Sequence, residues 1–383
     1  MQPDAERAFE QMVARVDTTL DAVGEAFPYV AEPDTGAWTT TDDGNWCGGH
    51  WVGLLWLAHE YTGEDRFRTA AERATETVVA SVEPRSMFYG MNANYCGFRA
   101  FDLTGEQRFR EIGIDGADRT VDYFHQGARQ VPLGTQPIEA PATNFRGPEA
   151  DEGPSGDVLG AVDSVYTALP VLWRAYRETG DPTYRDTAVS HADRTLDWFV
   201  REDGRTWHHA EFDPETGELV RQYNELAYSD DTCWARGQGW AIAGLARAYD
   251  ETGAERYLDA LERTVGYYET HAPADLVPYW DFEHPDAPDV PRDTSAAGLA
   301  AYGLTRLDDS PETADLRETG DAILDSLVEN YQTPTGAEDD RQPGMVIEGC
   351  YNGPAGYADA NELVWTDYYV AVALANRAGV VSV

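Results

Sequence analysis

A short turn built on Thr-Gly recurs along the chain, each time between two stretches of helical hydrophobic spacing. An acidic residue or an alanine follows the glycine, and an aromatic residue comes a few positions later. A glycine just past a helix end takes the left-handed conformation that closes the helix, and the residue after it starts the next one. The turns lie at Thr62-Gly63, Thr104-Gly105, Thr179-Gly180 and Thr252-Gly253. The chain is therefore predicted to be an internal repeat of helical hairpins.

Helical spacing continues through almost the whole chain and divides it into twelve predicted helices. Their ranges are 4–25, 49–62, 64–81, 93–104, 106–126, 160–179, 182–200, 234–252, 254–270, 293–307, 311–331 and 361–378. Six hairpins can close into a ring whose inner helices are buried on both sides. An open solenoid is the alternative, although its repeats are expected to be more uniform. The fold class is all-α in either case.

Four long connections all lie on the same side of the predicted ring, because each precedes an even-numbered helix. They span 127–159, 201–233, 271–292 and 332–360. The second contains a predicted strand hairpin that pairs 206–212 with 218–223. Long loops on one rim of a rigid scaffold are where binding and catalytic residues usually lie. That rim is the expected place for a site.

Polar and aromatic residues gather at the starts of the even-numbered helices. These clusters are Trp46–Trp51, Asn92–Phe98, Asp163-Ser164, Trp234–Arg236, Arg292–Ser295, and Asn361 and Glu362 with Trp365 and Asp367. Amphipathic helices do not need such residues in register at one end. If the even-numbered helices line the ring, the clusters meet at one mouth, which favours a functional site there.

The stretch 230–240 has the most distinctive of these clusters. Two aspartates lead into Trp234, Arg236, Gln238 and Trp240, with glycines at positions 237 and 239. Aromatic faces beside one arginine suit a sugar ring that carries a carboxylate. The alternative is a helix start with buried tryptophan anchors, in which the two aspartates cap the approach to the helix.

Asp163 lies within an otherwise apolar stretch, 160–172. A poorly solvated carboxylate has a raised pKa and can hold a proton near neutral pH as a general acid. The alternative is an aspartate that caps the helix and takes no part in chemistry. Asp293 fits better as a helix cap or as the partner of an arginine.

His208 and His209 are expected to end a strand, so at most one of them faces the site, because neighbouring strand residues point in opposite directions. A metal site needs further ligands, and neither H-x-x-x-H nor C-x-x-C occurs. Hydride transfer, phosphate transfer and serine acylation lack their sequence motifs as well. We therefore predict no metal and no cofactor.

The formal net charge of −41 comes from 69 acidic and 28 basic residues, and all the basic ones are arginine. This excess of negative charge argues against nucleic acid or an anionic membrane as a partner. It also indicates a protein adapted to high salt, and the alternative is an ordinary acidic protein. The four widely spaced cysteines favour free thiols. With no signal-like segment or membrane-length apolar run, the expected location is the cytoplasm.

Several blocks of the chain resemble those of unsaturated glucuronyl hydrolases, glycoside hydrolase family 88. They are 234–242, 278–282 followed by 291–297, 365–369, His208 with 212–217, and 46–56. They follow one another in the family's order and extend over nearly the whole chain. The resemblance implies a single (α/α)6 barrel domain over residues 1–383. It also implies a substrate, an oligosaccharide left by a polysaccharide lyase with a 4,5-unsaturated uronic acid at its non-reducing end.

The mechanism implied by the resemblance begins with a protonated aspartate that delivers a proton to C4 of the enol ether. Water then adds at C5, and the resulting hemiketal opens and releases the aglycone. Asp163 matches the acid/base position of the family, and Arg236 suits the uronate carboxylate. Within the blocks that resemble the family, the other predicted substrate-binding residues are Trp46, His208, Trp234, Gln238 and Trp240.

Two departures from the family pattern fall among these polar positions. Asn94 and Tyr95 stand where the family has His-Asp, and Glu225 with Leu226 stands where the family often has His-Gln. Related unsaturated rhamnogalacturonyl hydrolases work with one catalytic aspartate, and Glu225 is a candidate substitute carboxylate. A sugar epimerase of the same barrel type, which needs two facing histidines, and a non-catalytic sugar-binding protein are the alternative functions. The sequence leaves the polysaccharide, the linkage and the oligomeric state undetermined.

Overall fold

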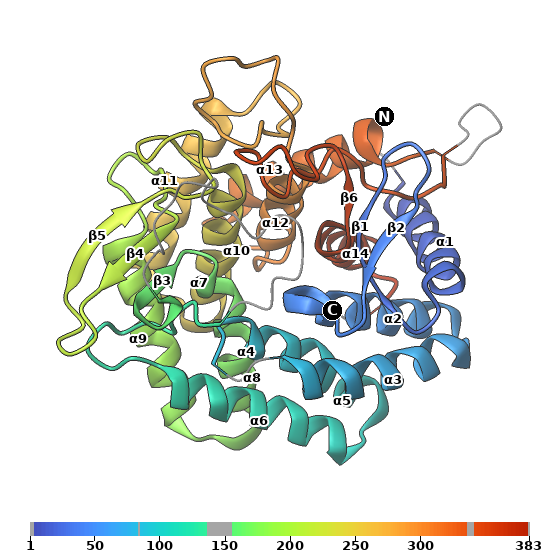
Figure 1. Cartoon of the computed structure of the whole chain (residues 1–383), viewed down its shortest axis with the longest axis horizontal. Coiled ribbons are helices and arrows are strands. Elements are labelled where there is room, and N and C mark those ends of the chain that lie inside the picture. The colour runs from blue at the N-terminus through green and yellow to red at the C-terminus, as the bar shows by residue number, and fades with distance from the viewer. Residues whose placement is uncertain (1–3, 83–84, 136–154, 335–340, 382–383) are drawn as a thin grey trace.

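The chain forms a ring of inner helices surrounded by outer ones, as the computed structural model shows for residues 4–82, 85–135, 155–334 and 341–381 (Figure 1). The inner helices are α2 (Gly48–Thr62), α4 (Phe88–Ala93) with α5 (Arg99–Thr104), α7 (Ser164–Thr167) with α8 (Leu169–Thr179), α10 (Ala235–Thr252), α12 (Thr294–Leu304) and α14 (Val364–Ala378). The outer helices are α1 (Ala5–Val23), α3 (Asp65–Ser81), α6 (Gln107–Tyr123), α9 (Pro182–Trp198), α11 (Glu255–His271) and α13 (Ala314–Ser326). Because α14 packs against α2, the ring is closed. The α/α barrel is confirmed, and the open solenoid is excluded.

Small residues allow the inner helices to approach one another closely. A Cβ atom built on Gly303 of α12 would lie 2.7 Å from the Cα of Ala243 in α10, and one on Gly239 would lie 2.8 Å from the carbonyl oxygen of Ala296. Inner helices are therefore buried on nearly every side, whereas outer helices such as α6 bury one face only.

The Thr-Gly turns close the hairpins as predicted, and the structure also explains the threonine. Gly63 has φ +72°, and its N–H donates to the carbonyl of His59 at 2.8 Å. The hydroxyl of Thr62 donates to the carbonyl of Ala58 at 2.7 Å and accepts from the N–H of Glu64 at 3.2 Å. The other three turns repeat this arrangement. Threonine therefore ties the end of one helix to the start of the next.

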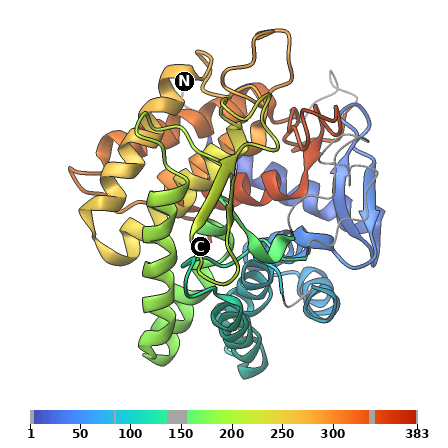
Figure 2. The ribbon, with the colours of Figure 1, turned by 60° about the vertical axis from the view of Figure 1, so that its left-hand side comes forward.

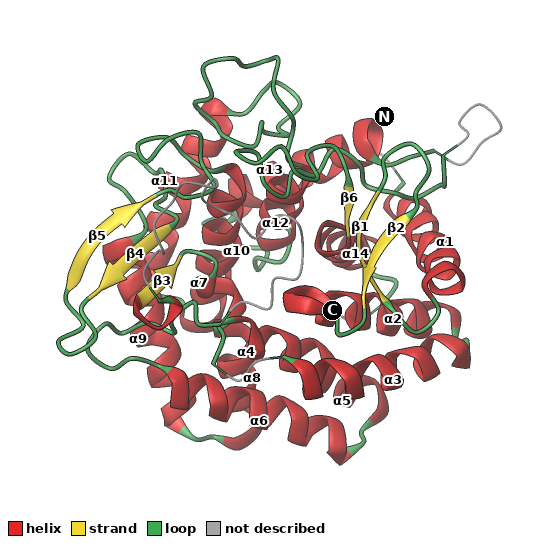
Figure 3. Ribbon diagram, in the orientation of Figure 1, coloured by secondary structure: helices red, strands yellow, loops and turns green. Residues whose placement is uncertain are grey.

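Two sheets of three strands lie at the end of the barrel where the inner helices begin (Figure 3). One has the order β2 (Trp38–Thr41), β1 (Phe27–Ala31), β6 (Glu362–Leu363), and the other has β3 (Leu159–Ala161), β4 (His209–Phe212), β5 (Leu219–Tyr223). All pairs are antiparallel. Figure 2 brings the predicted β4–β5 hairpin to the front of the molecule. The first of its strands starts at His209, three residues later than predicted.

Three predicted helix starts are wrong. The twelfth helix was predicted from residue 361, but Glu362–Leu363 form β6 and α14 begins at Val364. The fourth predicted helix begins at Phe88 instead of residue 93, and it continues through a π-helical segment, η2 (Asn94–Phe98), into α5. The sixth was predicted from residue 160, but 159–161 form β3, and the helix begins at Ser164. β3 pairs with β4, so a strand from a distant part of the sequence overrides the local helical spacing.

We call the end of the barrel formed by the starts of the inner helices the N-terminal mouth, and the other end the C-terminal mouth. The connections predicted on one rim meet at the N-terminal mouth and are joined there by backbone hydrogen bonds, including Ala235 to Trp280, Trp280 to Pro291, and Thr294 to Glu348. Parts of two of these connections, 136–154 and 335–340, lie outside the described residues. No described helix has both the length and the apolar character that crossing a membrane requires.

Candidate active site

Asp163 lies at the N-terminal mouth between β3 and α7. The backbone N–H of Val162, beside it, donates to the carbonyl of His208 at 2.9 Å, which fixes the connection. Asp163 occupies the N-cap position of α7, but its side chain makes no cap hydrogen bond to that helix. The carboxyl is buried, and its Oδ2 atom has no hydrogen-bond partner.

This burial raises the pKa of Asp163 to about 6, even though electrostatic interactions with His209 and Arg236 act in the opposite direction. About a tenth of the carboxyl groups therefore hold a proton at pH 7. A carboxyl group that is partly protonated near neutral pH, and whose Oδ2 atom has no hydrogen-bond partner, is suited to general acid catalysis.

His208 is the nearest titratable partner of Asp163, with 3.8 Å between its Nε2 atom and Oδ2 of the carboxyl. Burial, followed by the charges of His209 and Arg236, lowers the pKa of His208 well below 6.5, so the imidazole is neutral at physiological pH. Its Nδ1 atom is buried without a hydrogen-bond partner. The ring lies 4.4 Å from that of Trp234, measured between centroids. A neutral imidazole here can orient the proton of Asp163 without lowering its pKa.

His209 also belongs to this cluster, and the expectation that the two histidines face opposite ways is wrong. Their rings stack with centroids 3.7 Å apart and planes at 27°. The alternation of strand side chains does not apply, because β4 begins at His209 and His208 precedes it. Nδ1 of His209 lies 3.2 Å from an Oε2 oxygen of Glu225. Stacked rings cannot face each other across a sugar, which is the arrangement that an epimerase needs.

Arg236 supplies a fixed positive charge beside this cluster. One terminal nitrogen donates to the carbonyl of Cys350 at 2.5 Å and lies 3.4 Å from Oδ2 of Asp293, and the other donates to the carbonyl of Tyr351 at 2.7 Å. Asp293 also accepts from the backbone N–H of Ser295 at 3.0 Å. Both expectations for Asp293, a helix cap and an arginine partner, are therefore confirmed. Because protein acceptors hold both terminal nitrogens, Arg236 acts on the site through its charge.

Aromatic side chains continue from Arg236 along the rim. The guanidinium lies over Trp234 at 4.6 Å and over Tyr351 at 5.6 Å. Tyr351 packs against Trp365 at 5.2 Å, and Trp365 packs against Trp46 at 4.9 Å between ring centroids. Trp234, Tyr351, Trp365 and Trp46, which we call the aromatic arc, thus follow the N-terminal mouth. The indole Nε1 of Trp46 is buried without a partner.

Four predicted site residues on the inner helices lie away from this mouth, namely Trp240, Gln238, Tyr95 and Asn94. Trp240 is 1% exposed and packs against Tyr166 and Tyr369 within the barrel. The amide of Gln238 donates to the carbonyls of Gly204 and Thr264, so it faces outwards and secures α10 to α11. Tyr95 bonds through its hydroxyl to Tyr166 and Tyr369, each at 3.4 Å.

The early start of the fourth helix explains the position of Tyr95 and of Asn94. From Phe88, seven residues at about 1.5 Å each carry Tyr95 about 10 Å into the barrel. Asn94 lies at a similar depth and lines a cavity at the C-terminal mouth. Asn92 was not predicted as a site residue, but it donates to the carbonyl of Trp46 and accepts from the N–H of Gly49. It therefore fixes the position of Trp46.

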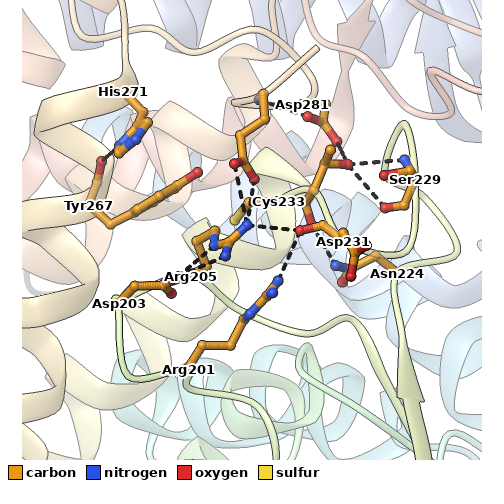
Figure 4. A network of polar contacts seen from close by, with 12 residues as sticks. Arg201, Asp203, Arg205, Asn224, Ser229, Asp231, Cys233, Tyr267, His271 and Asp281 are labelled. Atoms are coloured by element: carbon orange, nitrogen blue, oxygen red, sulfur yellow. Dashed lines mark hydrogen bonds and ion pairs between the residues drawn. The ribbon is translucent and has the colours of Figure 1, made fainter. Parts of the chain in front are cut away.

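A polar network secures the segment that carries Glu225 and leads to Trp234 (Figure 4). Oδ1 of Asn224 accepts from the backbone N–H of His208 at 2.6 Å, and its amide donates to the carbonyls of Asp230 and Thr232. Arg201 and Arg205 both donate to the carbonyl of Asp231. The N-cap position of α10 is occupied by Trp234, and no side-chain cap hydrogen bond is made there. The expectation that Asp230 and Asp231 cap this helix is therefore wrong.

Among the described residues, no three His, Cys, Asp or Glu side chains are grouped as a metal site would require. Asp163, the neighbouring histidines, Arg236 and the aromatic arc lie together at the N-terminal mouth. A proton-holding carboxylic acid at the mouth of an α/α barrel, beside aromatic faces and a fixed cation, defines the class of carbohydrate-cleaving α/α-barrel enzymes.

The chain belongs to Glycosyl Hydrolase Family 88, whose model matches residues 24–376. It is 30% identical over 360 residues to the unsaturated glucuronyl hydrolase of Bacillus sp. (strain GL1), which covers 93% of this chain and 92% of the relative. It is 28% identical over 382 residues to the unsaturated chondroitin disaccharide hydrolase of Streptococcus pneumoniae, covering 96% and 90% respectively. The crystal structure of the Bacillus sp. GL1 enzyme superimposes with a TM-score of 0.84 at 26% identity, covering 97% of this chain and 96% of that one.

Proposed function

We propose that the protein removes a 4,5-unsaturated uronic acid from the non-reducing end of oligosaccharides left by polysaccharide lyases. Membership of the family supports the reaction class. The observation that carries the assignment of roles is the buried carboxyl of Asp163, with a pKa of about 6, an Oδ2 atom free of hydrogen bonds, and a neutral His208 at 3.8 Å.

The reaction begins when protonated Asp163 transfers its proton to C4 of the enol ether. The electron pair of the C4–C5 double bond forms the new C–H bond, and positive charge develops at C5 and the ring oxygen. The Asp163 carboxylate left behind stabilises that charge and accepts a proton from the water that attacks C5. The product is a hemiketal, and Asp163 has regained its proton.

The hemiketal then opens by cleavage of the bond between C5 and the ring oxygen. C5 becomes a ketone, and C1 becomes a hemiacetal that still carries the rest of the oligosaccharide. Collapse of this hemiacetal releases the shortened oligosaccharide and leaves an aldehyde at C1. The protein needs to assist only the first step, since hemiketals and hemiacetals open readily in water.

The neighbouring groups have complementary roles in the proposal. The fixed charge of Arg236 attracts the uronate carboxylate, and the N-terminal ends of the inner helices favour an anion at the same mouth. The aromatic arc offers faces on which sugar rings stack. Glu225, through His209, positions His208 and takes no direct part in proton transfer. We retain Trp46, His208, Trp234 and Arg236 as residues of the substrate site.

We place the reaction in the cytoplasm of a salt-adapted cell. The four cysteines are unpaired and buried, which fits a reducing compartment. The net charge of −41 is the support for high salt.

The test is to incubate the protein in high salt with lyase digests of pectin, alginate, xanthan, ulvan and a glycosaminoglycan. The conjugated enol absorbs ultraviolet light, and we expect this absorbance to fall with at least one digest, with release of an oligosaccharide one sugar shorter. Asp163→Asn should fold, as judged by circular dichroism, and leave the absorbance unchanged. Full activity of this variant, or tight binding of every digest without turnover by the wild type, would contradict the proposal.

A further inference from the structure

The structure contains a polar cavity of about 260 Å³ at the C-terminal mouth. It is lined by residues from the C-terminal halves of the inner helices, among them Arg99 and Asp102 of α5, Arg174 of α8, Arg247 of α10 and Val372 of α14. Asp163 and the aromatic arc lie at the opposite ends of these helices. Along α10, the eleven residues from Arg236 to Arg247 correspond to about 16 Å.

Side chains in the middle of the barrel separate the cavity from the N-terminal mouth. Tyr95, Tyr166 and Tyr369 are joined through their hydroxyls, and Trp240 packs on Tyr166 and Tyr369. All four side chains are buried. The cavity is therefore separate from the proposed active site and is not an extension of it.

Arginines and tyrosines dominate the cavity lining. The arginines are Arg99, Arg174, Arg177, Arg247 and Arg306, and the tyrosines are Tyr95, Tyr166, Tyr302 and Tyr368. The lining carboxylates are Asp102 and Asp250. In a chain with 69 acidic and 28 basic residues, five arginines around one cavity are a marked local reversal of charge.

Four of these arginines have carboxylate partners. Arg99 pairs with Glu60, and Arg177 and Arg247 both pair with Glu251. Arg174 lies 2.5 Å from Asp102 and 2.8 Å from Glu178. Ion pairs and the negative ends of the inner helices account for these four without a ligand.

Arg306 is different. It follows α12, and within the described part of the chain no carboxylate lies within ion-pair distance of it and no hydrogen bond to it is formed. Its guanidinium lies 5.1 Å from the ring centroid of Tyr302, and Asp250 is the carboxylate whose charge acts on it. The hydroxyl of Tyr302 accepts from that of Tyr166 at 2.7 Å. The Arg306 guanidinium therefore lies beside phenol groups in the cavity without an anion partner to balance its charge.

We propose that this cavity binds one small anion, a carboxylate or phosphate on a hydroxylated molecule no larger than a monosaccharide. Arg306 supplies the charge and a planar fork of donors, and the phenols of Tyr302 and Tyr368 bond to hydroxyl groups of the ligand. The volume of about 260 Å³ accommodates one sugar-sized molecule.

Isothermal titration at constant ionic strength tests the proposal with three probes, namely D-glucuronate, inorganic phosphate and D-glucose. We expect one-to-one binding of glucuronate or phosphate, with the preferred probe identifying the source of the anion, and no binding of glucose. Arg306→Gln should weaken this binding at least tenfold and change the rate of enol hydrolysis less than twofold. Arg185→Gln, which removes an exposed arginine paired with Asp186, is the matched control and should bind as the wild type does.

Asp163→Asn serves as a second control, since binding at the C-terminal mouth does not involve that carboxyl. The proposal is overturned if neither anion binds to the wild type, or if Arg306→Gln binds as tightly as the wild type does. Should Arg306→Gln fail to fold, wild-type crystals soaked in bromide decide the matter. An anomalous peak beside the Arg306 guanidinium supports the site, and a cavity without one contradicts it.

Discussion

The two mouths of the barrel treat buried charge in opposite ways. At the N-terminal mouth, Asp163 is buried beside a neutral histidine and forms no hydrogen bond through Oδ2. At the C-terminal mouth, Glu178 accepts from both Arg110 and Arg174. Burial raises the pKa of both carboxyl groups, but for Glu178 the hydrogen bonds and charges of the two arginines outweigh it, and the pKa falls below its usual value.

The difference shows what prepares a carboxyl group for chemistry in this fold. Asp163 is buried and Glu178 is partly buried, so the two carboxyl groups differ both in burial and in their arginine partners. The absence of an arginine fork leaves Asp163 able to hold and release a proton near neutral pH, whereas Glu178 stays ionised and contributes to stability.

The largest expected effect separates these two carboxyl groups by activity. Asp163→Asn should lower kcat by about 10³-fold or more, because the general acid is lost while the shape of the site is kept. Glu178→Gln, the matched change at the other mouth, should alter kcat less than twofold. Wild-type kcat should also fall tenfold per pH unit above about pH 6, where Asp163 loses its proton. Similar rates for the two variants would remove the distinction between the mouths.

A second prediction concerns stability and has the opposite sign for Asp163→Asn. The folded-state pKa of about 6 exceeds the unfolded value of 3.8, so the folded state binds the proton more tightly. The contribution of the Asp163 carboxyl to wild-type stability is therefore greatest below pH 4 and falls between pH 4 and 6. By pH 7 it is about 3 kcal/mol lower. The variant lacks this loss, so its advantage in free energy of unfolding should grow over that interval. Urea denaturation at pH 4, 5, 6 and 7 measures it, and a constant difference would argue against a raised pKa.

A smaller effect is expected for His208→Asn. The neutral imidazole lies 3.8 Å from the Asp163 carboxyl and contacts Trp234, so the substitution loosens the geometry of proton delivery without removing the acid. We expect kcat to fall about 30-fold, less than the roughly 10²- to 10⁴-fold that a general acid or base itself contributes, while the pH at which activity declines stays near 6. A pH–rate profile distinguishes this from titration of the histidine itself. A decline that moves by more than one pH unit would mean that His208 shares the titration.

Much of the fold could be predicted because its signals are local. Each Thr-Gly turn contains the hydrogen bonds that end one helix and start the next, so four positions in the sequence specify the hairpins. Asp163 could also be identified locally, because an acidic residue in an apolar stretch is expected to be buried and poorly solvated.

The remaining site residues depend on contacts that the sequence does not reveal. His209 joins the site because β4 starts one residue after His208, and that boundary is set by pairing with β3, about fifty positions earlier in the chain. Gln238 was predicted to be a site residue because of its neighbours in the 230–240 stretch. Its amide instead donates hydrogen bonds to the carbonyls of Gly204, in a loop, and Thr264, in α11. Because α10 is buried on nearly every side, Arg236 and Gln238, two positions apart, contact different parts of the chain.

The smallest expected effect is that of Tyr95→Phe, although Tyr95 occupies the place of an aspartate in the resemblance. Its hydroxyl makes two long contacts of 3.4 Å within the barrel, so the variant should lose about 1 kcal/mol of stability or less and keep kcat within twofold. Tyr95→Asp, which restores the aspartate, should instead destabilise the fold by several kcal/mol, because the carboxylate would be buried among His50, Tyr166 and Tyr369. Thermal unfolding and enol hydrolysis of both variants measure these outcomes. A loss of tenfold or more in kcat for Tyr95→Phe would show that the middle of the barrel takes part in the reaction and that the two mouths are not independent.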